Sequence, residues 1–207
     1  MKLKELFEDI TKQYPIPLES EGLDMSKEAR YGRAESLGFD INHVYYHGTI
    51  HNFKSFDPRL SDSARNTGTP LGALVLSSNP VVSASYAGED TDGWGKVRNY
   101  HLGGNIMPLF LKKGKVLIVD AKGHNWNDLY IKKYPHLENT NDFAHYVQSK
   151  GMDTLIIKNV HDTASWKDKE NRQSRLGDTI FVFHPSNVRS INAKFDPANI
   201  HSEDLMA

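Results

Sequence analysis

The sequence predicts an α+β protein in which short strands outnumber helices and form a split or sandwiched sheet. Two observations carry this prediction. Short runs of apolar, β-branched and aromatic residues, each bounded by Gly, Pro or polar residues, recur along the chain and are typical of strands. Apolar residues at helical spacing occur in only a few stretches. With 207 residues, of which 38% are hydrophobic and 25% charged, the chain is long enough for one domain with a real core.

Four helices are expected, and their ends are marked by capping residues. Ser26 is a good N-cap and Gly38 a natural C-terminal stop. Asn79-Pro80 begins another helix with proline near its first position, and Gly151 follows the last one. The expected helices span residues 2–14, 26–36, 80–88 and 142–150. The first of them, stopped by Pro15, makes residues 1–25 an N-terminal helical arm on a main domain of residues 26–198.

The strands are expected between these helices, and polar loops separate several of them. The strands span residues 44–47, 72–78, 106–111, 115–120, 154–158, 178–183 and 187–191. Long polar loops are expected at residues 59–70, 89–104 and 162–177, and residues 199–207 are expected to form a flexible tail. Loops of this length inside a compact domain are usually functional or mobile.

Composition and charge narrow the classes of function. The formal net charge is −1, so no global field favours nucleic acid; a nucleic acid partner is disfavoured, although a local basic patch stays open. The chain has no cysteine, which excludes disulfides, a thiolate zinc site and a cysteine nucleophile and agrees with a cytoplasmic location. We expect no membrane span, because no apolar run is long enough. Neither a dinucleotide-binding GxGxxG nor a P-loop motif occurs.

A candidate site begins where the first main strand runs into His47-Gly48-Thr49. Gly48 lets the backbone come close to another group, and it is flanked by a ring nitrogen and a hydroxyl. Taken alone, His47 is better explained as a residue that caps a strand and bonds a neighbouring loop. His43, His47 and His51 recur every four residues, but across a strand and a turn this spacing does not converge, so no metal site is expected.

Further along, the chain carries an ordered set of motifs that resembles the ADP-ribosyltransferase family, and more narrowly its phage and polyvalent-protein branch. The resemblance covers about residues 30–196. The motifs are residues 44–49 (VYYHGT), a strand ending in Ser77-Ser78, residues 83–87 (SASYA), residues 178–190 (DTIFVFHPSNVRS) and residues 192–197 (NAKFDP). The resemblance implies a split antiparallel β-sandwich with flanking helices. It also implies NAD as substrate, a protein as the target of mono-ADP-ribosylation, and a role in host takeover or against a host defence.

The family's functional residues match positions of this sequence one at a time. The resemblance implies that His47 bonds the nicotinamide-side ribose and that the backbone of Gly48, followed by Thr49, holds the nicotinamide carboxamide. It implies that Tyr86 stacks on the nicotinamide ring and that Asp178 is the catalytic carboxylate. Ordinary alternatives stay open: Tyr86 as a core aromatic of its helix, and Asp178 as a turn residue beside a glycine.

Two departures from the family pattern and two sets of auxiliary residues complete the prediction. Leu74 stands where many relatives have an aromatic residue, and Asp178 is one methylene shorter than the usual glutamate. Both departures also fit a catalytically inactive fold that acts as a protein-binding inhibitor. Ser77 and Ser78 are expected either to bond the nucleotide or to cap the strand end. The candidates for binding the NAD phosphates are Arg65, Arg59, Arg30 and Arg33.

Overall fold

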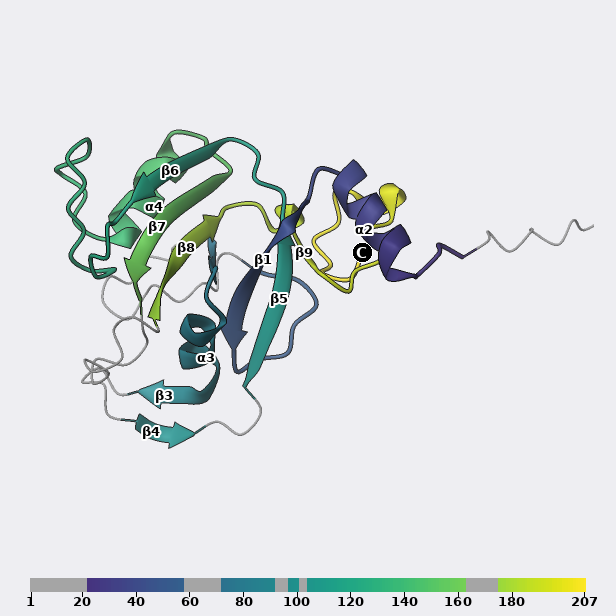
Figure 1. The fold of residues 1–207 in the computed structure, drawn as a ribbon, viewed down its shortest axis with the longest axis horizontal. Coiled ribbons are helices and arrows are strands. Elements are labelled where there is room, and N and C mark those ends of the chain that lie inside the picture. Colours follow the sequence, from purple (N-terminus) through teal and green to yellow (C-terminus); the bar gives the residue numbers. More distant parts are fainter. Residues whose placement is uncertain (1–21, 58–71, 92–96, 101–103, 163–174) are drawn as a thin grey trace, which may run out of the picture.

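The computed structural model describes residues 22–57, 72–91, 97–100, 104–162 and 175–207, and these residues form an α+β fold built on one large sheet (Figure 1). The sheet has seven strands in the order β6-β7-β8-β2-β1-β5-β9. They are β1 (Asp40–Thr49), β2 (Leu74–Ser77), β5 (Asn105–Leu111), β6 (Val116–Asp120), β7 (Thr154–His161), β8 (Leu176–Val182) and β9 (Val188–Ser190). Neighbouring strands are antiparallel except β6 and β7, which are parallel. The predicted α+β class is therefore confirmed, with a mixed sheet.

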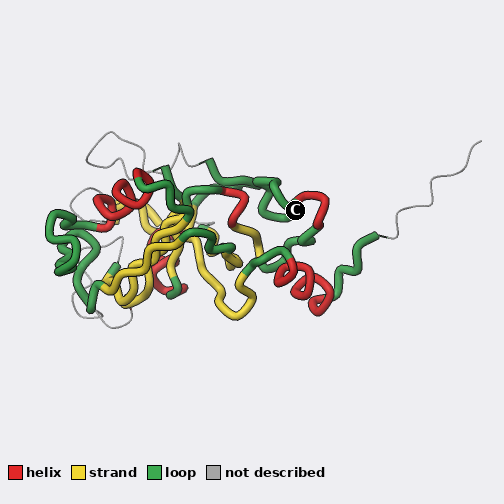
Figure 2. The backbone as a smooth tube through the Cα atoms, turned by 90° about the horizontal axis from the view of Figure 1, so that it is seen from above, coloured by secondary structure: helices red, strands yellow, loops and turns green. Residues whose placement is uncertain are grey.

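Three α-helices lie within the described residues, and each agrees with a predicted one. They are α2 (Lys27–Ser36), α3 (Pro80–Gly88) and α4 (Thr140–Ser149). The Ser26 hydroxyl accepts a hydrogen bond from the Ala29 N–H at 3.3 Å, as an N-cap does. Gly38 has a φ of +87°, which explains why glycine follows α2. In both views α4 lies at one end of the molecule and α2 at the other (Figures 1 and 2).

The polar stretch expected to be a loop at residues 89–104 contains a second, two-stranded sheet. Its strands are β3 (Glu89–Thr91) and β4 (Val97–Tyr100), which pair antiparallel with Glu89 opposite Tyr100. The prediction of a loop over these residues was wrong. A short strand without alternation of apolar and polar residues carries no sequence signal, because it is stabilised by backbone pairing.

The large sheet is nearly divided between β1 and β2. These two strands meet in a single residue pair, Tyr46 with Ser77, whereas β2 pairs with β8 along its whole length. On one side of this junction lie β6, β7, β8 and β2, and on the other lie β1, β5 and β9. Both strands of this junction carry candidate site residues.

The two faces of the sheet bury different cores, because successive side chains of a strand point to opposite faces. On the α4 face, Phe181 and Ile157 pack with Phe143 and Val147 of α4. The opposite face, called here the Tyr45 face, buries mainly Tyr45, Leu76, Leu109, Ile156, Ile180 and Val182. A third cluster joins α2 to the remaining end of the sheet and contains Phe39, Phe110 and Phe195.

The C-terminal residues 199–207 are packed on the fold and are not the flexible tail that the sequence predicts. Leu205 is only 2% exposed. Its N–H donates to the Lys54 carbonyl at 2.8 Å, and its carbonyl accepts from the Ser190 N–H of β9 at 2.9 Å. The prediction failed because these backbone contacts are made with segments remote in the chain, which local sequence patterns do not reveal.

Buried Arg189 fixes the same region. Its guanidinium donates to the carbonyls of Ser186, Val188, Asn199 and Ser202. Burial lowers the pKa of Arg189, and nearby Asp204 opposes that shift. Of the predicted N-terminal arm, residues 1–21 lie outside the described residues. Within the described residues, no helix combines the length and the apolar character that crossing a membrane requires.

Candidate functional site

His47 lies at the junction between β1 and β2, and its ring bonds the neighbouring strand. Nδ1 is 2.9 Å from the carbonyl oxygen of Val75, beyond the single Tyr46–Ser77 pair. A carbonyl can only accept, so Nδ1 carries the proton and Nε2 of the neutral ring is an acceptor. Burial lowers the pKa of His47, and the hydrogen bond to Val75 opposes that shift in part. The imidazole is therefore neutral near pH 7 and can accept a hydrogen bond from a hydroxyl.

Two aromatic side chains pack against the His47 ring. Its centroid lies 5.1 Å from that of Phe56 and 5.9 Å from that of Phe53, both in edge-to-face geometry. Because Phe53 and Phe56 pack with the core of the Tyr45 face, His47 belongs to that face. This arrangement holds the ring in one orientation, as a residue that positions a ligand requires.

Gly48 is needed where β1 passes under α3. A Cβ added at Gly48 would lie 1.8 Å from the backbone oxygen of Ser83, so only glycine fits. Ser83 also donates through its hydroxyl to the Tyr46 carbonyl at 2.9 Å. The predicted close approach to Gly48 is therefore made by α3. Thr49 is buried, and its hydroxyl accepts from the His51 N–H at 3.0 Å.

Ser77, Ser78 and Asp178 join the ends of β2 and β8. The Ser77 hydroxyl accepts from the Asn79 N–H at 3.1 Å, next to the start of α3. The Ser78 hydroxyl accepts from the Asp178 N–H at 2.8 Å, so both serines cap the strand end. One carboxylate oxygen of Asp178 accepts from the backbone N–H of Asn159 at 3.1 Å. Asp178 is thus held by both neighbouring strands.

Tyr86 is not a core aromatic of its helix. Its side chain is 46% exposed, and its hydroxyl donates to the Asp162 carboxylate at 2.7 Å. Asp162 is only 7% exposed and follows β7, and its second oxygen accepts from the Thr179 hydroxyl at 3.4 Å. Sequence patterns offered little signal for Asp162, which was assigned to the start of a polar loop.

The structure brings two of the three predicted catalytic residues to one face of the sheet and the third to the other. Asp178 lies two residues before Ile180, so it points to the Tyr45 face with His47. With β2 between their strands, their Cα atoms are roughly 10–12 Å apart, from ordinary strand spacing. Thr179, to which Asp162 and Tyr86 are linked, points to the α4 face.

The arginines expected to bind phosphate are only partly described. Arg30 donates to the Ile191 carbonyl at 2.7 Å, and Arg33 donates to the carbonyls of Lys194 and Asp24 at 2.8 Å, so both tie α2 to neighbouring segments. Arg59 and Arg65 lie outside the described residues, and their assignment stays a prediction.

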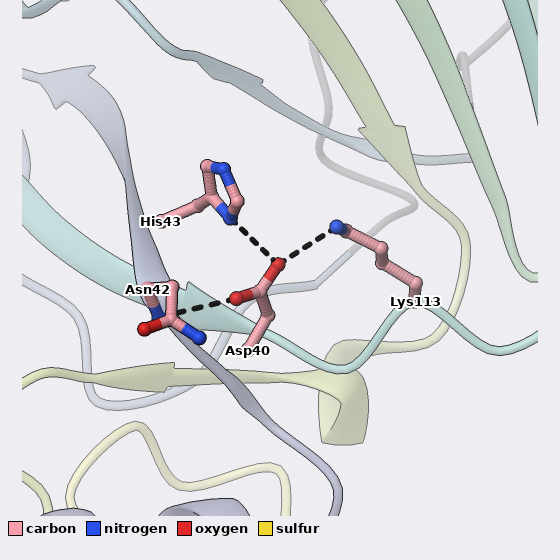
Figure 3. Close-up of polar contacts among 4 residues, drawn as sticks. All are labelled: Asp40, Asn42, His43 and Lys113. Carbon is pink, nitrogen blue, oxygen red and sulfur yellow. Dashed lines mark hydrogen bonds and ion pairs between the residues drawn. The ribbon is translucent and has the colours of Figure 1, made fainter.

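At the other end of β1, a separate ionic cluster fixes the start of the strand (Figure 3). One Asp40 oxygen lies 2.7 Å from Lys113 Nζ and 2.9 Å from His43 Nδ1, and the other accepts from the Asn42 N–H at 3.1 Å. Burial alone would raise the pKa of Asp40, but the hydrogen bonds from Lys113 and His43 outweigh it and lower that pKa. In the part of the chain that is described, no group of three His, Cys, Asp or Glu residues is placed to hold a metal ion.

Comparison of the chain with models of protein families, with curated proteins and with solved structures finds no match in any of the three. The contacts described above define an α+β protein in which one face of a split sheet carries a neutral histidine bonded to Val75 and an aspartate bonded to Asn159 and Ser78.

Proposed function

We propose that the protein is an NAD-dependent mono-ADP-ribosyltransferase that transfers ADP-ribose from NAD to a protein target. One observation carries the proposal: His47 and Asp178 flank the end of β2 on the same face, and hydrogen bonds to Val75 and from Asn159 hold their side chains in place. The ordered motifs from His47 to Asp178 support the same function. In this proposal the two halves of the sheet correspond to the split antiparallel sandwich of the family.

The reaction breaks the bond between the nicotinamide nitrogen and C1′ of the ribose. The electron pair leaves with nicotinamide, and positive charge develops on the ribose ring, as in glycoside cleavage. The Asp178 carboxylate stabilises this charge, because a preorganised negative group acts most strongly where charge develops. The acceptor of the target protein then bonds to C1′ and releases a proton.

The remaining residues bind the substrate. Nε2 of His47 accepts a hydrogen bond from a ribose hydroxyl, which its neutral state and fixed Nδ1 permit. The ring of Tyr86 stacks on nicotinamide, a contact worth roughly 0.5–1.5 kcal/mol beyond the burial of area. We further propose a cytoplasmic effector of phage or mobile-element origin that modifies a host or defence protein. The motif resemblance alone supports that part.

The test is release of nicotinamide and transfer of label from NAD in the presence of a host lysate. Asp178→Asn keeps the shape of the side chain and is expected to lower the rate roughly 100-fold or more, as loss of a transition-state charge contact does. Asp178→Glu restores the carboxylate usual in the family and should retain activity. Asp128→Asn, the same change on an exposed loop carboxylate, is the matched control. Activity of Asp178→Asn equal to wild type would refute the proposal.

A second candidate is a catalytically inactive fold that binds and inhibits a protein. The position of Tyr86, whose hydroxyl contact lies on the opposite face from Asp178, favours it. This candidate predicts that partner binding survives both His47→Ala and Asp178→Ala. Calorimetry that detects submillimolar binding of NAD would count against it.

A further inference from the structure

The contact between α3 and the neighbouring strand ends is unusually polar for a buried region. Nine polar or charged side chains are buried among the described residues. Five of them belong to α3 or to β2, β8 and the residue after β7: Ser77, Ser83, Ser85, Asp162 and Thr179. Buried polar groups need hydrogen-bond partners, so this region is held in one specific arrangement. Of these five residues, Asp162 is the one with an ionisable side chain, and it has no role in the predicted site.

Asp162, which follows β7, contacts α3 and β8 through its two carboxylate oxygens. One oxygen accepts from the Tyr86 hydroxyl of α3 at 2.7 Å, and the other from the Thr179 hydroxyl of β8 at 3.4 Å. Its backbone N–H donates to the Arg175 carbonyl at 3.2 Å, just before β8. The carboxylate is therefore fixed by its own surroundings, which is what a group needs in order to fix another.

We propose that Asp162 is a positioning residue for Tyr86: it holds the hydroxyl so that the exposed ring keeps one orientation for stacking on the nicotinamide of NAD. The inference rests on the proposed function and adds a residue to its site. The Tyr86 side chain is 46% exposed, and the hydrogen bond from its hydroxyl to Asp162 restricts the rotamers that it can adopt. Fixing it before binding removes an entropic cost that the ligand would otherwise bear.

A purely structural role for Asp162 predicts a different pattern of effects. A structural tie between α3 and β8 would change stability and leave the KM of the folded enzyme for NAD unchanged. A catalytic carboxylate would lower kcat. A positioning residue raises KM for NAD and changes kcat little, because it acts on substrate binding through Tyr86.

The test is a double-mutant cycle with Tyr86→Phe, Asp162→Asn and the double variant. Steady-state release of nicotinamide gives kcat and KM for NAD. Each single variant is expected to raise KM roughly 5- to 10-fold, the size of one lost hydrogen bond, with kcat within about 3-fold of wild type. The KM of the double variant should be no higher than that of the single variant with the higher KM, because both substitutions remove the same contact.

Matched variants test whether the rise in KM comes from the contact between Tyr86 and Asp162 or from losing any hydroxyl or any charge. Tyr130→Phe changes the most exposed large aromatic side chain of the described residues, at 67%, and Asp128→Asn changes an exposed carboxylate. Both should keep KM at the wild-type value. Asp162→Ala, which removes both oxygens, should raise KM more than Asp162→Asn, which keeps one acceptor oxygen.

Two kinds of failure can be told apart. If wild type releases nicotinamide and folded Tyr86→Phe keeps its KM, or if the two single effects multiply in the double variant, the role of Asp162 is overturned alone. If wild type neither binds NAD nor releases nicotinamide, the proposed function falls and the inference with it. Tyr86 is half exposed, so Tyr86→Phe is expected to fold even if a change at Asp162 does not.

Discussion

The tightest steric constraint in the candidate site is at Gly48, and Gly48→Ala tests it. Cβ atoms in real structures keep at least 3.0 Å from such neighbours, whereas this Cβ would lie 1.8 Å from the Ser83 backbone oxygen, so the two elements must separate by about 1.2 Å. The φ of Gly48 is not among the positive values, so the cost comes from the clash and not from backbone strain. Overpacking of this kind costs about 1–3 kcal/mol, and a backbone obstacle places it near the upper end.

Thermal unfolding measures this cost. A loss of about 3 kcal/mol lowers the Tm of a chain of this size by roughly 6–12 °C. The matched control is Gly32→Ala in α2, where an added Cβ meets no atom within 4 Å and helix propensity should raise stability by about 0.5–1 kcal/mol. A Gly48→Ala protein that melts within about 2 °C of wild type would show that α3 does not press on β1 as described.

Two further predictions concern His47 and Arg189. Because burial lowers the folded-state pKa of His47 below its unfolded value near 6.5, its contribution to stability is complete above that value and is lost as pH falls through the lower folded pKa. Denaturant titrations at about pH 7.5 and pH 5.5 give the free energy of unfolding at each pH. Between these two values His47→Gln should lose less of it than wild type does. Equal losses would contradict the burial of a neutral ring. Arg189→Met should lower the free energy of unfolding by about 3 kcal/mol, because it leaves several carbonyls without a donor. It should also speed amide hydrogen exchange at residues 199–207. Unchanged exchange there would contradict the anchoring role of Arg189.

The elements of the fold could be predicted where local chemistry decides the structure. Ser26 and Gly38 mark the ends of α2 because a capping hydroxyl and a left-handed glycine act within a few residues. The apolar run after Asp178 identifies β8 for the same reason. The pair β3–β4 and the packed C-terminal residues could not be predicted, because backbone pairing and the burial of Leu205 depend on segments remote in the chain.

The sequence suggests which residues belong to the candidate site, and that set stays a prediction, but their arrangement could not be predicted. Side-chain alternation puts His47 and Asp178 on one face of the sheet and Thr179 on the other. This assignment depends on the strand order and register, which cannot be read from the sequence. The partner of Tyr86 was missed because a single aspartate after a strand resembles any loop carboxylate. Only the contact at 2.7 Å distinguishes Asp162 from other polar loop residues.

The near-division of the sheet explains why stability and function should be coupled in this protein. β1 and β2 share one residue pair, so their relative position depends on what bridges them. The His47 ring does so through Val75, and α3 does so by starting beside Ser77 and resting on Gly48. The helix that carries Tyr86 is therefore also a brace across the junction. A substitution that shifts α3 must then change both the melting temperature and the affinity for any ligand bound between Tyr86 and the sheet.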